Sequence, residues 1–291
     1  MKVSRLLNNQ ALLGWMLVLP AIVILGTFFF YPMIYALVLS FYSWNLLGTK
    51  TFVGFENYEF LFADPVFRRA LWNTLYFTVF NLAGTFVLAL GVALLVTRES
   101  WGYRIFRAVS LMPLVIPMVI TGIIWGLLLE PTGVVNVVLD LVGIEGKEWL
   151  YNSKWAMPAI ILVSIWHSFG LYILLFVAGL QNIPDELHEA AGIDGAGRWR
   201  IFWRITLPLL RPTTFFVLTL LLINSFKAFD TIWVMTQGGP GNSTTTLVVY
   251  MYQKIFTSVG DATAASIVLF VIIFALVLLQ YFSMGREEKH S

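Results

Sequence analysis

Between two apolar runs, the chain carries a hydrophilic segment that reads EAAGIDGAGRWRIFWRITLPLLRP over residues 189–212. Just before it, Pro184 is followed by Asp185 and Glu186. This order is typical of a helix start, because proline presets φ and the acids oppose the positive end of the helix dipole. Gly195 offers a stop, since glycine tolerates the left-handed cap. The segment therefore predicts a helix, a glycine bend and a second short helix, displayed between two membrane spans.

The second predicted helix is basic and amphipathic. Arg200 and Arg204 are four residues apart and share one face, while Trp199 and Trp203 share another. Pro208 then interrupts the helical pattern before the next apolar run. By itself this pattern also suits an ordinary amphipathic helix lying at a membrane surface.

The composition identifies an integral membrane protein. Of the 291 residues, 59% are hydrophobic and 12% are charged, and a soluble protein carries about twice that charged fraction. The net charge of +2 is too small to imply nucleic acid as a partner. Cysteine is absent, which excludes disulfides, thiol nucleophiles and cysteine metal sites.

Six segments qualify as membrane spans, because a helix needs about 20 apolar residues to cross the hydrocarbon. They are residues 12–41, 72–97, 105–129, 156–180, 213–235 and 262–281. We expect a bend at Pro32 in the first and breaks at Pro113 and Pro117 in the third. The first run is too long for a signal peptide and lacks a small-residue cleavage pattern, so we interpret it as an uncleaved span. The sequence predicts an all-α integral membrane protein with one transporter core over residues 72–281.

The distribution of lysine and arginine predicts the orientation. With the N-terminal residues 1–11 in the cytoplasm, eleven of the eighteen basic residues fall on inside segments and six on outside segments, with Lys227 inside a span. An excess of basic residues marks the cytoplasmic side. Both termini and the loop over residues 181–212 are therefore expected in the cytoplasm.

The loop resembles the EAA loop of ABC importer permeases. The family pattern is Glu-Ala-Ala, three residues, Gly, nine residues, Ile, one residue and Leu-Pro. It is matched without departure by Glu189, Ala190, Ala191, Gly195, Ile205, Leu207 and Pro208. The resemblance implies a type I ABC importer permease fold with six transmembrane helices. It also implies that residues 185–205, Asp194 included, dock on a separate cytoplasmic ATPase.

Further segments resemble carbohydrate importers, and among them the first permease of the maltose type. They are residues 54–58, 64–65, 73–74, 179–184, 229–230 and 236–240. The resemblance implies a bacterial or archaeal inner-membrane protein that pairs with a second, homologous permease. Two ATPase subunits, or a homodimer of one, and an extracytoplasmic solute-binding protein would complete the importer of a sugar, polyol or glycerol-phosphate type of solute.

A phosphate-binding loop is missing from the sequence. Gly146-Lys147 is followed by Glu148 and not by a hydroxyl residue, so this chain lacks the motif that cradles nucleotide phosphates. We expect ATP and Mg²⁺ on the partner ATPase, with no cofactor, metal site or catalytic residue in this chain.

Polar residues inside predicted spans are candidates for the substrate path, because they are costly in a membrane and are usually functional. They are Asn224, Lys227 and Asp230 in the fifth span and Trp166 and His167 in the fourth. Lys227 and Asp230, three residues apart, also fit a self-neutralising ion pair on one helix face.

Two other functions remain open at this point. An intramembrane enzyme could use His167 with Asp230 as a dyad. An ion-coupled secondary carrier could use Lys227 and Asp230 as a relay. Neither function explains the pattern over residues 189–208.

Overall fold

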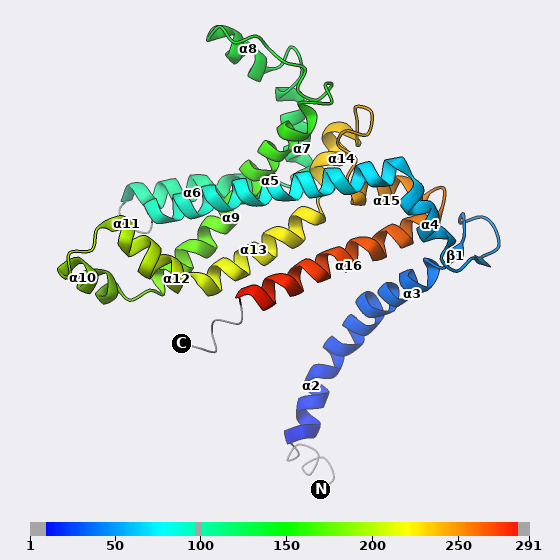
Figure 1. The fold of residues 1–291 in the computed structure, drawn as a ribbon, viewed down its shortest axis with the longest axis horizontal. Helices are drawn as coiled ribbons and strands as arrows, with labels where there is room; N and C mark the ends of the chain where they lie inside the picture. Colours follow the sequence, from blue (N-terminus) through cyan, green and yellow to red (C-terminus); the bar gives the residue numbers. More distant parts are fainter. Residues whose placement is uncertain (1–9, 97–100, 285–291) are drawn as a thin grey trace. The chain divides into compact units, whose positions relative to one another are not determined.

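A computed structural model describes residues 10–96 and 101–284 (Figure 1). Over these residues the chain is mainly helical, with one small antiparallel hairpin that pairs β1 (Tyr42–Ser43) with β2 (Thr51–Phe52). The chain divides into two compact units, one formed by residues 1–63 and 251–268 and the other by residues 64–250 and 269–291. The functional residues predicted above all belong to the second unit.

The first unit holds the N-terminal helices and the hairpin. Its elements are α2 (Gln10–Leu25), the π-helix η1 (Gly26–Phe30), α3 (Tyr31–Leu39) and α4 (Glu56–Ala63). The buried Asn57 of α4 donates its amide to the Ser40 carbonyl at 2.8 Å and to the Tyr42 carbonyl at 3.1 Å. These two bonds fix α4 against the chain that leaves α3.

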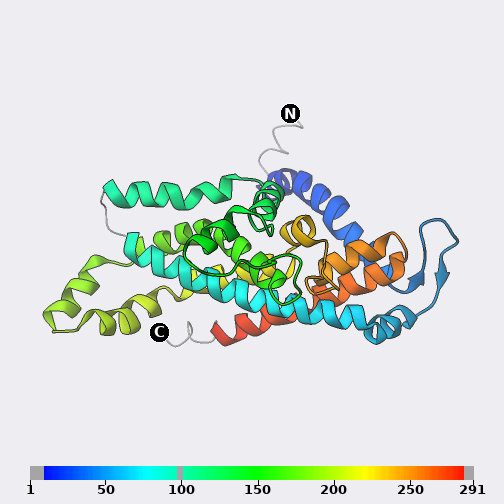
Figure 2. The same cartoon turned by 90° about the horizontal axis from the view of Figure 1, so that it is seen from above.

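The second unit is a helical bundle. Its elements are α5 (Pro65–Val96), α6 (Trp101–Val115), α7 (Met118–Leu128), α8 (Val134–Leu141), α9 (Ala156–Gln181), α10 (Asp185–Ile193), α11 (Arg198–Ile201), η2 (Phe202–Thr206), α12 (Leu207–Leu209), α13 (Arg211–Phe226) and α14 (Asp230–Thr236). Parts of α15 (Leu247–Ile255) and α16 (Val259–Met284) complete it. Helix α5 runs along α9 and α13, as both views show (Figures 1 and 2).

Helix α9 lies at the centre of this bundle because small residues allow its neighbours to approach closely. A Cβ atom on Gly170 would lie 2.2 Å from the Ser110 carbonyl oxygen of α6. One on Gly179 would lie 2.4 Å from the Thr213 hydroxyl of α13. Small residues at helix contacts are typical of membrane bundles, where close packing takes the place of the hydrophobic effect. The apolar core here includes Phe176 of α9 and is buried between α5, α9 and α13.

Five helical segments of the described chain are long and apolar enough to cross a membrane, and α6 with α7 makes a sixth if the bent pair is one span. The two helices meet at 98°. The break falls at Pro117, whose extended backbone (φ −54°, ψ 137°) precedes α7, while Pro113 stays inside α6. A proline drives the residue before it out of the helical region, which explains a break at this position.

Two π-helices, η1 and η2, each end two residues before a proline. In η1 the N–H of Tyr31, which precedes Pro32, bonds to the carbonyl of Gly26, five residues back. The same pattern recurs in η2 before Pro208. A proline ring clashes with the carbonyl four residues earlier, and a widened turn accommodates it while retaining a backbone bond. The expected irregularity at Pro32 therefore lies in the turn before the proline.

Candidate functional site

Helix α10 begins and ends as its sequence predicts. Pro184 precedes it in an extended conformation, and Asp185 and Glu186 occupy its first turn. At its C-terminus Gly195 has a φ of +75°. The N–H of Ala196 bonds to the Ala191 carbonyl at 2.9 Å, and the N–H of Gly195 bonds to the Gly192 carbonyl at 3.1 Å. These two bonds define a Schellman motif, which requires the left-handed residue that glycine supplies.

The Glu-Ala-Ala residues occupy different faces of α10. Ala191 is buried at 9% exposure, whereas Glu189, Ala190 and Asp194 are exposed. A Cβ atom on Gly195 would meet no atom of the described chain within 4 Å. The glycine is therefore needed for its backbone conformation and leaves open space above the end of the helix.

The second arm of the loop combines α11, η2 and α12. Its residues Ile205, Leu207 and Pro208 are half-buried, and Phe202 of η2 packs against the apolar core that includes Phe176. His188 of α10 lies with its Nε2 3.1 Å from the hydroxyl of the buried Thr206. This bond ties the two arms together. The sequence reading did not include either residue in the site, because their separation of 18 residues gives no periodic signal.

The loop exposes large apolar side chains on its surface. Ile193 is 87% exposed and Trp199 76% exposed, and Leu187 and Trp203 are exposed as well. The Phe202 ring lies edge-on to the rings of both tryptophans, with its centroid 6.3 Å from that of Trp199 and 5.3 Å from that of Trp203. Exposed apolar groups of this kind, rimmed by charges, are typical of a protein interface.

Of the two interpretations of Lys227 and Asp230, the ion pair is not formed among the described residues. Helix α13 ends at Phe226, Lys227 follows as its cap, and α14 begins at Asp230. Three residues bring two side chains together only in a continuous helix. No ion pair joins the two among the described residues, and both side chains are exposed.

Nearby, Asn224 is exposed and donates its amide to the Tyr172 hydroxyl of α9 at 3.2 Å. The structure thus links Asn224 to the central helix and leaves the two charged residues on the surface of α13 and α14.

In the fourth span, Trp166 and His167 have different surroundings. Trp166 is partly exposed, and its ring lies edge-on to the Trp125 ring of α7, with 5.4 Å between the ring centroids. His167 lies with Nε2 2.8 Å from the Ile116 carbonyl, at the break between α6 and α7. His167 therefore satisfies a carbonyl that the break releases from helical bonding. No hydrogen bond joins it to Asp230 in the described chain, so the geometry of the dyad is absent there.

The comparisons with known proteins agree with this architecture. A family profile described as "Binding-protein-dependent transport system inner membrane component" matches residues 85–286. The sulfoquinovosyl glycerol transport system permease protein of Agrobacterium fabrum is 38% identical over 91% of this chain and 87% of its own length. The arabinooligosaccharides transport system permease protein of Halalkalibacterium halodurans is 34% identical over 99% of this chain and 93% of its own.

A solved structure is similar over nearly the whole chain. It is one chain of a bacterial ABC transporter involved in the import of the acidic polysaccharide alginate. The sequences are 27% identical, the TM-score is 0.83, and the match covers 98% of this chain and 99% of the other.

Proposed function

Because this chain belongs to the family of binding-protein-dependent transport system inner membrane components, we propose that it forms half of the membrane pathway of an ATP-driven importer for a carbohydrate solute. A second, homologous permease forms the other half. Two ATPase subunits dock on the cytoplasmic loop and hold the ATP and Mg²⁺, so that this chain needs no cofactor and catalyses no reaction. An extracytoplasmic binding protein delivers the solute from outside.

The Schellman-capped helix α10 is the single observation that carries this proposal. Its Ala191 is buried, while Glu189, Ala190 and the open space over Gly195 are accessible to a partner. Small residues allow a partner surface to come close, and the carboxylate offers a charge to pair with. A push on α10 reaches Thr206 through His188 and then α13, which begins five residues later at Arg211. Closure of the ATPases thus switches the bundle between inward- and outward-facing states.

The exposed polar residues of α13 and α14 support a partner permease. Asn224, Lys227 and Asp230 lie on the surface of a segment long and apolar enough to span the membrane. Exposing such polar and charged side chains to lipid costs free energy. Contact with a second permease, or with water in a path between the two permeases, costs less free energy. In such a path these side chains offer sugar hydroxyls both hydrogen-bond donors and acceptors.

The names of the relatives support a carbohydrate solute. The two relatives described above are named for the transport of sulfoquinovosyl glycerol and of arabinooligosaccharides. The structural relative belongs to an importer of alginate. An ion-coupled carrier of the same fold loses its proposed relay, because no ion pair joins Lys227 to Asp230 in the described residues.

The test replaces Gly195 in proteoliposomes that hold both permeases and the ATPases and are supplied with the binding protein. Gly195→Trp places a large ring in the open space above α10 and forces a non-glycine residue into a left-handed conformation. We expect normal membrane insertion and loss of sugar uptake. Gly195→Asn is the matched control, since asparagine adopts that conformation readily, and it should retain most of the uptake.

Uptake by the Gly195→Trp complex at the wild-type rate would contradict docking at α10. Uptake by wild-type vesicles that contain no nucleotide would contradict the whole assignment as an ATP-driven importer.

A further inference from the structure

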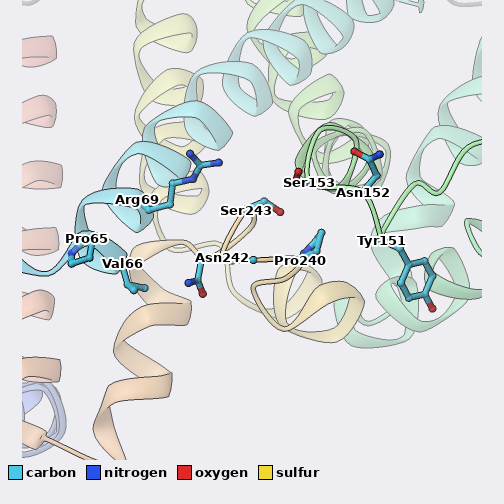
Figure 3. A pocket seen from close by; sticks show the side chains of 10 residues that line it. Pro65, Val66, Arg69, Tyr151, Asn152, Ser153, Pro240, Asn242 and Ser243 are labelled. Carbon is cyan, nitrogen blue, oxygen red and sulfur yellow. The ribbon is translucent and has the colours of Figure 1, made fainter.

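A polar pocket of about 720 Å³ opens in the second unit, away from α10. Three segments far apart in the sequence line it: the first turns of α5, the connection between α8 and α9, and the connection between α14 and α15 (Figure 3). Its polar lining residues are Arg69, Tyr151, Asn152, Ser153, Asn242 and Ser243. None of them is among the site residues that the sequence predicts, because no single segment contains the pocket.

Two lining groups have unused bonding capacity. Ser243 is only 4% exposed, and its hydroxyl has no hydrogen-bond partner among the described residues. A buried hydroxyl without a partner costs free energy, so a ligand that bonds to it is favoured. Arg69 is exposed and forms no ion pair in the described chain. In Figure 3 the Ser243 side chain lies between Arg69 and Ser153.

The wall that carries Ser243 is held rigidly. Asn73, one helical turn after Arg69, donates its amide to the carbonyls of Asn242 and Thr245, both at 2.9 Å. The Thr245 hydroxyl donates in turn to the Gly238 carbonyl at 3.0 Å. Since the wall is preorganised, a ligand does not have to order it, which favours binding.

We propose that this pocket is an external binding site for a carbohydrate unit that carries an oxyanion, a carboxylate or a sulfonate. The inference rests on the proposed function, which places the pocket on the outer side of the membrane. The Arg69 guanidinium holds the oxyanion through two parallel hydrogen bonds. Ser243, Ser153 and the Asn152 amide face the sugar hydroxyls.

The size and chemistry of the pocket favour this ligand class. Its volume lies within the range of roughly 300–1,000 Å³ that is typical of small-molecule sites. Of the ten residues that line it, Arg69 carries the charge. The Tyr151 ring is 63% exposed and offers a face for a sugar ring. A carboxylate side chain of the binding protein is the other possible source of an oxyanion, and the experiment distinguishes the two.

The test measures binding of a galacturonic acid disaccharide to the purified transport complex in lipid nanodiscs, without the binding protein. Its neutral galactose counterpart is the second probe. Arg69→Gln should weaken binding of the acidic probe by about tenfold, the usual effect of losing a hydrogen bond to a charged group, and leave the neutral probe unchanged. Ser243→Ala should weaken both probes by roughly threefold without lowering stability, because it breaks no internal bond.

Arg68→Gln is the matched control, because Arg68 is the exposed neighbour of Arg69 and does not line the pocket. It should bind both probes as the wild type does. Equal losses in the two arginine variants, or no binding of the acidic probe to the wild type, would overturn the proposal.

The two arms of the experiment separate the sources of the oxyanion. If Arg69→Gln weakens docking of the binding protein but leaves the affinity for the acidic probe unchanged, the site belongs to the binding protein, and the proposal is wrong. ATP-driven uptake by the same wild-type complex is measured in parallel in sealed proteoliposomes supplied with the binding protein. Its absence contradicts the proposed function, whereas its presence with unaltered probe binding in Arg69→Gln contradicts only the pocket.

Discussion

His167 shows how a single polar side chain in a membrane helix acquires its role from its neighbours. The sequence presents it beside Trp166 in the middle of an apolar run, a typical position for a group that lines a substrate path. The structure places its Nε2 2.8 Å from the Ile116 carbonyl, which the break before Pro117 leaves without a helical donor. The side chain therefore stabilises the 98° bend between α6 and α7.

His167→Ala should destabilise the assembled permease, since the Ile116 carbonyl loses its donor. The expected loss is about 0.6 kcal/mol, the average measured for hydrogen bonds between membrane helices, and at most about 1.7 kcal/mol. Unfolding of the complex in mixed micelles measures it. His167→Gln can place an amide nitrogen near the position of Nε2 and should recover part of the loss. Equal stability of all three proteins would show that the bond contributes nothing.

At the scale of elements, the turn between α14 and α15 behaves as part of the core. Residues 243–247 are all buried. The Leu247 N–H bonds to the Thr74 hydroxyl of α5 at 2.8 Å, one residue after the Asn73 amide that binds the same turn. The turn is thus fastened to a helix that precedes it by about 170 residues.

Asn73→Ala should release this turn, because it removes the donor to two carbonyls in a buried site. We expect a loss of about 1–3 kcal/mol in stability and faster proteolysis within residues 238–247. Limited proteolysis with peptide mapping measures both the rate and the site. Trp72→Phe is the control, since Trp72 is the exposed neighbour. If both variants are cut at the wild-type rate, the turn does not depend on Asn73.

The break between α13 and α14 leads to a second prediction at this scale. With a helix break between Lys227 and Asp230 and without an ion pair, their charges should act independently. A double-mutant cycle of Lys227→Met and Asp230→Asn, scored by stability, should give a coupling energy below about 0.5 kcal/mol. A coupling energy well above that value would show that the two side chains do form the ion pair that their spacing allows.

At the scale of the whole molecule, orientation is the property that the proposed function needs most. The eleven-to-six distribution of basic residues favours a cytoplasmic loop over residues 181–212. The polar pocket then lies on the outer side. Because the chain contains no cysteine, single thiols introduced at exposed positions report the side directly.

Trp199→Cys should react with a membrane-impermeant maleimide only in inverted vesicles, and Tyr151→Cys should react in intact cells. Both side chains are exposed in this chain, at 76% and 63%, and the inverted vesicles are stripped of the ATPase so that docking does not cover residue 199. Labelling of Trp199→Cys in intact cells would reverse the predicted orientation and remove α10 from reach of a cytoplasmic ATPase.

The sequence by itself determined the features that depend on local composition. Apolar runs predict helices of membrane length because the bilayer leaves no water for backbone groups. The order Pro184 to Gly195 predicts the start and end of α10 because capping depends on neighbours within one turn. The Glu-Ala-Ala pattern over residues 189–208 indicated the family.

Only the tertiary structure decided which polar groups meet. The partner of His167, the bond between His188 and Thr206 and the pocket around Arg69 all join segments that are distant in the chain. The ion pair that the spacing of Lys227 and Asp230 allowed does not form among the described residues, since helical spacing says nothing about where a helix breaks. Helix packing places these side chains, and the sequence pattern does not encode that packing locally.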